Sequence, residues 1–89
     1  MANNMMSVVI GDEFFVAGFL YGGFDRGIVV KDRKDVKIKI NEAIEKGDAG
    51  LIVVEKSFVD VDDEGFIKRL KADASMPLVV DIDGGYGNG

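Results

Sequence analysis

Three carboxylates stand where apolar runs of the sequence end, and their types suit metal chemistry. Asp12 and Glu13 follow the run SVVI, and Glu55 follows the run GLIVV. Because the carboxyl ends of parallel strands meet at one edge of a sheet, we expect these side chains to converge there. Carboxylate oxygens are the ligands that a hard divalent cation prefers. Asp12, Glu13 and Glu55 are therefore the candidates for a metal site.

An acidic pair after the first strand and an acid at the end of the third is also typical of phosphoacceptor receiver domains. An active receiver is disfavoured here, because the glutamate at position 55 does not place its carboxylate where the shorter aspartyl nucleophile would lie. The chain also ends before a fifth strand could supply a lysine. The alternative that stays open is a degenerate receiver-like domain that binds a divalent cation or a signalling partner through Asp12, Glu13 and Glu55.

Two other motifs are incomplete. The stretch IGDEFFVAGFLYGGF has only Gly11 in its turn, so it lacks both a dinucleotide fingerprint and a Walker loop, and we attribute Gly18 to close helix–sheet packing. The stretch DVDDEG imitates half of a calcium loop, but Lys71 stands where a bidentate glutamate is needed. We interpret these acids as stabilising a helix N-terminus. No cofactor is expected.

Composition excludes several classes of function. The 89 residues include 11 basic and 16 acidic residues, which give a net charge of −5, and the lysines form no continuous basic stripe. Nucleic acid is therefore not an expected partner. The chain has no cysteine and no histidine, which excludes thiolate metal sites and the usual zinc ligand and proton shuttle. No segment has the length and apolarity of a signal peptide or membrane span, so we expect a cytoplasmic protein without membrane insertion.

Four apolar, β-branched runs predict fully buried parallel strands, at residues 7–10, 27–30, 50–54 and 77–80. Helices are expected between them, from Asp12 or Glu13 to the glycines at 22–23, from about residue 36 with an Asp35 cap, and over 63–72. The fold class is then α/β, with one globular domain at residues 6–83. We interpret residues 1–5 as a disordered tail, with Met5 or Met6 an equally good natural start, and residues 84–89 as a glycine-rich linker.

The aromatic residues of the first expected helix exceed what one buried face can hold. Phe15 and Phe19 are four residues apart and share a face. If they face the sheet together with Val16, then Phe14 and Tyr21 are left near the surface as candidate partner-binding residues. The alternative is that Phe14 tucks over the strand ends and Tyr21 lies flat, and the sequence leaves both possibilities open.

The motif G-D-E-x-x-V-x-G-F-x-x-x-G resembles the opening of the F subunit of the archaeal A-type and vacuolar V-type rotary ATPases. It is carried here by Gly11, Asp12, Glu13, Val16, Gly18, Phe19 and Gly23. The stretches GDAGLIVVEKSF and MPLVVDI resemble the third and fourth strands of that family. The resemblance covers about residues 6–83, and only the first motif is specific.

The resemblance implies a flavodoxin- or receiver-like three-layer sandwich with strand order 2-1-3-4, an order that right-handed crossovers also favour. It implies a non-catalytic central-stalk subunit that binds the coiled-coil shaft, helps couple rotation and regulates ATP hydrolysis, peripheral to the membrane. Members of the family end in a mobile helix that extends toward the catalytic hexamer. We expect this sequence to be a truncated domain whose GGYGNG leads to that helix. A self-dimerising adaptor is a third hypothesis.

Overall fold

The computed structural model describes residues 5–84 of the chain. The four apolar runs form strands: β1 (Met6–Gly11), β2 (Arg26–Val29), β3 (Ala49–Glu55) and β4 (Leu78–Ile82). All neighbouring pairs are parallel, and the order across the sheet is β2-β1-β3-β4. The predicted strands and their order 2-1-3-4 are confirmed.

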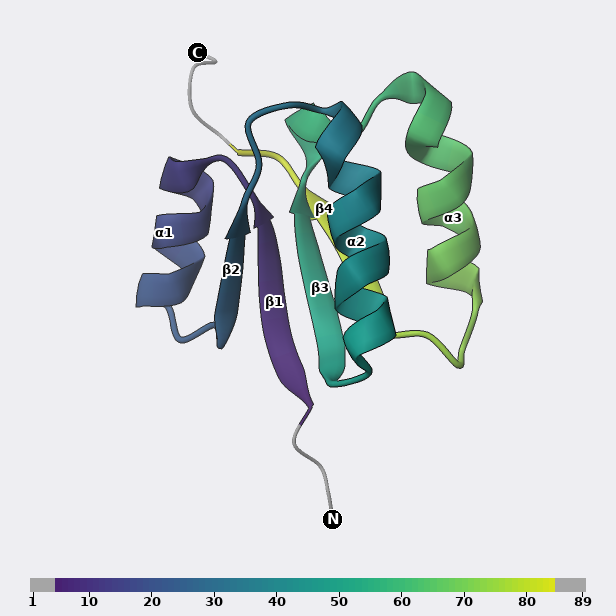
Figure 1. Ribbon diagram of the computed structural model, residues 1–89, viewed down its shortest axis with the longest axis horizontal. Coiled ribbons are helices and arrows are strands. Elements are labelled where there is room, and N and C mark those ends of the chain that lie inside the picture. Colours follow the sequence, from purple (N-terminus) through teal and green to yellow (C-terminus); the bar gives the residue numbers. More distant parts are fainter. Residues whose placement is uncertain (1–4, 85–89) are drawn as a thin grey trace.

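The helices lie on both faces of the sheet, as the three-layer prediction requires. They are α1 (Glu13–Tyr21), α2 (Lys34–Lys46) and α3 (Glu64–Ala72), with two short 3₁₀ turns, Lys56–Phe58 and Val61–Asp63, between β3 and α3. Figure 1 shows α1 on one side of the sheet and α2 and α3 on the other. A crossover helix between successive parallel strands is the economical way to cover both faces.

Alternate residues of the strands feed two cores. The larger core packs strand side chains against α2 and α3, and its largest fully buried members are Val8, Ile10, Ile40, Ile52, Val54 and Val79. The smaller core joins Val9 of β1 and Val53 of β3 to Phe15 and Val16 of α1. Burying each such side chain stabilises the fold by about 1.5–3 kcal/mol. The two middle strands, β1 and β3, are apolar in continuous runs because they are buried on both sides.

The edge strands are less buried than predicted. Val29 of β2 is 46% exposed, and Leu78 of β4 is 62% exposed. Both strands have a neighbour on one side only, and no helix of residues 5–84 lies over the α1 face of β4. The prediction of four fully buried strands was therefore wrong for β2 and β4.

The ends of α1 match the prediction. Asp12 is the N-cap, and its Oδ1 accepts a hydrogen bond from the Phe15 amide at 2.8 Å. The helix ends at Gly22, whose amide donates to the Gly18 carbonyl, and Gly23 follows at a φ of 109°. Only glycine adopts that backbone conformation without steric cost.

The start of α2 differs from the prediction. The helix begins at Lys34 with Arg33 as its N-cap, and Arg33 makes no side-chain capping bond. Asp35 lies inside the first turn, because its amide already donates to the Asp32 carbonyl at 3.0 Å. The Asp35 cap was therefore wrong, although an acid in the first turn still suits the helix dipole. The helix ends at Gly47, with φ of 78°.

The close helix–sheet contact predicted at Gly18 lies elsewhere. A Cβ atom placed on Gly18 meets nothing within 4 Å, whereas one placed on Gly27 of β2 overlaps Val16 Cγ1 and lies 3.1 Å from Leu20 Cδ1. Helix α1 contacts β1 and β2. The glycine that lets α1 approach the sheet is on the strand, not on the helix.

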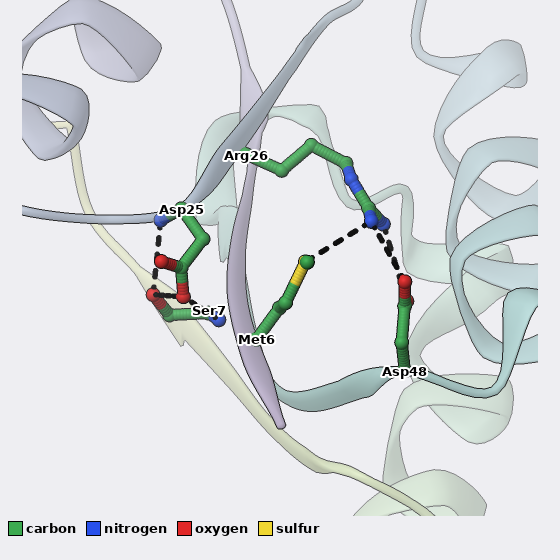
Figure 2. Close-up of polar contacts among 5 residues, drawn as sticks. All are labelled: Met6, Ser7, Asp25, Arg26 and Asp48. Carbon is green, nitrogen blue, oxygen red and sulfur yellow. Dashed lines mark hydrogen bonds and ion pairs between the residues drawn. The ribbon is translucent and has the colours of Figure 1, made fainter. Parts of the chain in front are cut away.

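Polar contacts hold the amino ends of the strands together (Figure 2). The amide and the hydroxyl of Ser7 both donate to Asp25 Oδ2, at 2.9 and 3.1 Å. The Arg26 guanidinium donates to Asp48 Oδ2 at 2.9 Å and to Met6 Sδ at 3.2 Å. The hydrogen bond from Arg26, together with its charge, holds the pKa of the Asp48 carboxyl below its usual value. Edge strand β2 is thereby fastened to β1 and to the turn before β3.

The expected tail at 1–5 and linker at 84–89 fall almost wholly outside the described residues, and both stay predictions. Of the residues in these two segments, the structure describes Met5, which lies over Gly50, and Gly84, which lies beside the Glu55 carboxylate.

Replacing Gly27 with alanine is expected to lower the free energy of unfolding by about 1–3 kcal/mol, because the new methyl group overlaps Val16. Gly18→Ala is the matched control. It is expected to raise that free energy by about 0.5–1 kcal/mol, since alanine favours a helix and the site has room. Urea unfolding measures both, and a Gly27→Ala variant as stable as the parent would contradict the contact.

Candidate functional site

Glu55 is the buried acid at the carboxyl edge of the sheet. Its side chain is 3% exposed, and its Oε1 accepts a hydrogen bond from the Asp12 amide at 2.8 Å. A Cβ on Gly11 would lie 2.7 Å from Oε1, and a Cβ on Gly84 would lie 2.7 Å from Oε2. Two glycines thus make room for this carboxylate. It links the end of β3 to the turn before α1 by a hydrogen bond and lies close to Gly84 after β4.

The structure brings Asp12 and Glu55 together but does not form the predicted three-carboxylate site. The contact uses the Asp12 amide, while the Asp12 carboxylate caps α1, and Glu13 is exposed in the first turn of that helix. Within residues 5–84, no group of three acidic, histidine or cysteine side chains is placed to hold a metal ion. Asp62 and Asp63 of DVDDEG lie in a 3₁₀ turn that leads into α3, and Glu64 lies in the first turn of that helix, which agrees with the helix N-terminus interpretation, although Asp63 at the N-cap makes no side-chain capping bond.

The outer face of α1 is apolar and exposed. Phe14 is 72% exposed and Tyr21 is 93% exposed, whereas Phe15 and Val16 are buried against the sheet. Phe14 therefore does not tuck over the strand ends, and Tyr21 does not lie flat on its neighbours. Glu13 is the one charged residue among the nine of α1. That Phe14 and Tyr21 bind a partner stays a prediction.

A groove runs beside this helix, and we call it the α1–β4 groove. It has a volume of about 480 Å³ and is lined by Phe14, Phe15, Gly18, Phe19, Gly22, Phe24, Ile82, Asp83 and Gly84. Its aromatic wall is continuous, because the rings of Phe15 and Phe19 lie 4.8 Å apart and those of Phe19 and Phe24 lie 5.0 Å apart. Asp83 is its one charged lining residue.

Sequence reasoning missed the groove, because it depends on the register of β4 against β3. Ile82 pairs with Glu55, and Val80 pairs with Val53, which belongs to the α1-side core. Ile82 therefore points toward the face that α1 covers. The alternation in LVVDI, with polar Asp81 before Ile82, was the one available signal.

A smaller hollow on the other side carries three lysines, Lys56, Lys68 and Lys71. Lys71 Nζ lies 2.6 Å from Asp81 Oδ1, and this bond holds the pKa of the Asp81 carboxyl below its usual value. The Lys71 charge is therefore already paired within the fold.

Among residues 5–84, no helix combines the length and the apolarity needed to cross a membrane.

Comparisons with known proteins agree with one another. Residues 8–89 match the family described as ATP synthase (F/14-kDa) subunit. The F subunit of the A-type ATP synthase of Methanothermobacter thermautotrophicus is 31% identical over 84 residues, which are 92% of this chain and 74% of that protein. The crystal structure of the V-type ATP synthase F subunit of Archaeoglobus fulgidus shares the fold, with a TM-score of 0.66 at 18% identity, over 90% of this chain and 99% of that one.

Replacing Glu55 with alanine is expected to lower the free energy of unfolding by about 1.5–3 kcal/mol, since the Asp12 amide loses its charged acceptor. Glu55→Gln keeps an acceptor and the volume, so we expect it to lose less than half as much. Thermal or urea unfolding distinguishes the two variants. Equal losses would mean that the hydrogen bond is not what Glu55 contributes.

Proposed function

This chain belongs to the family of ATP synthase F/14-kDa subunits, and from that premise we propose that it is a non-catalytic component of the central stalk of a rotary ATPase. In this role it binds the coiled-coil shaft subunit and helps to couple rotation to ATP synthesis or hydrolysis. It works at the cytoplasmic side of the complex, peripheral to the membrane. A part in regulating ATP hydrolysis is proposed on the resemblance alone, and no described residue is assigned to it.

One observation carries the proposal: α1 is apolar on its exposed face as well as on its buried face. A helix that is apolar all round is normally buried on every side. Here the fold buries one side of α1 and leaves Phe14 and Tyr21 more than two-thirds exposed. Large exposed aromatic residues are typical of protein–protein interfaces. A component of a multi-subunit complex has a partner to cover them.

The absence of histidine and cysteine from the sequence supports a binding role over a catalytic one. The acids at the carboxyl edge of the sheet serve the fold, since Asp12 caps α1 and Glu55 accepts the Asp12 amide. The receiver-like alternative requires a set of side chains that binds a cation, and within residues 5–84 no such set is formed.

Calorimetric titration with the purified coiled-coil shaft subunit tests the proposal. Phe14→Ala and Tyr21→Ala are each expected to weaken binding by about 2 kcal/mol, or roughly 30-fold, because truncating an interface aromatic removes its buried contact. Ile38→Ala is the matched control, since Ile38 is 54% exposed on α2 and is expected to leave binding unchanged.

No binding of the parent chain would overturn the shaft proposal. If the parent binds, and both aromatic variants bind with a free energy within about half a kcal/mol of the parent's, the outer face of α1 is not part of the interface.

A further inference from the structure

The two faces of the sheet are covered unequally. Helices α2 and α3 lie side by side on one face, while α1 alone lies on the other (Figure 1). Helix α1 contacts β1 and β2, the half of the sheet away from β4. On that face β4 has no helix over it among residues 5–84, whereas Val53 of β3 is buried beside Phe15 of α1.

Apolar side chains of β4 are exposed on this face. Leu78 pairs with Leu51, which packs against the α1-side core, and Ile82 pairs with Glu55. Because side chains alternate along a strand, Leu78 and Ile82 both point to the α1 face. Leu78 is 62% exposed and Ile82 is 36% exposed. An apolar strip of this kind is a surface that a parallel sheet ordinarily buries.

A four-stranded sheet has room for two helices on each face. Neighbouring strands lie about 4.8 Å apart, and packed helices lie about 8–10 Å apart, so four strands accommodate two helices on each face. The opposite face of the same sheet holds two, α2 and α3. The α1–β4 groove is therefore the place of the second helix on the α1 face.

The wall of the groove permits close approach. Gly18 and Gly22 lie on the flank of α1 that lines it, and a Cβ on Gly18 meets no atom within 4 Å. A helix set into the groove can therefore lie against the backbone of α1 and contact the rings of Phe15 and Phe19 that line it.

The distribution of charged residues indicates which charge the occupant carries. All 11 basic residues lie between Arg26 and Lys71, so β1, α1 and β4 contain none. The exposed acids Glu13, in the first turn of α1, and Asp83, after β4, lie near one end of the groove. An occupant with basic residues beside its apolar stripe complements the charges of these two acids.

We propose that the α1–β4 groove binds one helix of the coiled-coil shaft subunit, an inference that rests on the proposed function. That helix presents an apolar stripe at i, i+3, i+4 spacing to Gly18 and Ile82. Lysine or arginine residues flanking its stripe face Glu13 and Asp83. Phe14 forms the rim of the groove, and Tyr21, which does not line it, contacts the partner outside the groove.

Binding of the shaft subunit by Gly18→Arg and Gly65→Arg tests the groove. Both glycines are exposed in nine-residue helices and have no atom within 4 Å of an added Cβ, but Gly65 lies in α3 on the opposite face. Gly18→Arg is expected to weaken binding by about 30-fold or more, because its side chain fills the groove and carries the same charge as the partner. Gly65→Arg is expected to bind as the parent does, and both variants to keep the parent's melting temperature or exceed it.

The rim charge is tested separately. Asp83→Asn is expected to weaken binding several-fold at low salt and to reduce the dependence of affinity on salt concentration. If Asp83→Asn binds with the parent's affinity and salt dependence, the proposal that basic residues flank the apolar stripe of the helix is overturned.

The outcomes distinguish this inference from the function on which it rests. If the parent binds the shaft and Gly18→Arg binds equally well, the groove is not the site, and the stalk function stands. If the parent does not bind the shaft, the proposed function fails. If the parent sediments as a dimer that Gly18→Arg converts to a monomer, a second copy occupies the groove, and the proposal is overturned.

Discussion

A parallel sheet needs cover on both faces, because its strands carry apolar side chains on both sides. This chain covers one face completely, with α2 and α3 packed against Ile10, Ile52 and Val79. On the other face it supplies α1 alone, and the side chains of β4 that point there, Leu78 and Ile82, remain exposed. The apolar surface left over is what makes the domain suited to association with a larger assembly.

The fold presents this surface rigidly. Gly27 lets α1 lie directly on β2, and the Asp12 cap fixes where the helix begins. Glu55 connects that same turn to the end of β3 by a hydrogen bond of 2.8 Å. Two of the acids that first suggested metal chemistry, Asp12 and Glu55, thus fix the start of α1.

The sequence predicts the elements of this fold better than the details of its surface. Continuous apolar runs identify the strands, and the i, i+4 spacing of Phe15 and Phe19 identifies the buried face of α1, which leaves Phe14 and Tyr21 outside. Spacing does not reveal which way a carboxylate turns, so it could not distinguish an Asp12 that caps a helix from one that holds a metal ion. It also does not reveal which glycine is crowded, because the contact at Gly27 depends on where α1 crosses the sheet. The groove beside Ile82 required the register of β4, which no local pattern specifies.

Amide hydrogen exchange of the chain, alone and bound to the coiled-coil shaft subunit, shows which face of the sheet meets the partner. Binding is predicted to slow exchange in α1 and in β4, including the amides near Gly18 and Ile82, and to leave α2 and α3 unchanged. New protection confined to α2 and α3, with α1 and β4 exchanging as in the free chain, would contradict it.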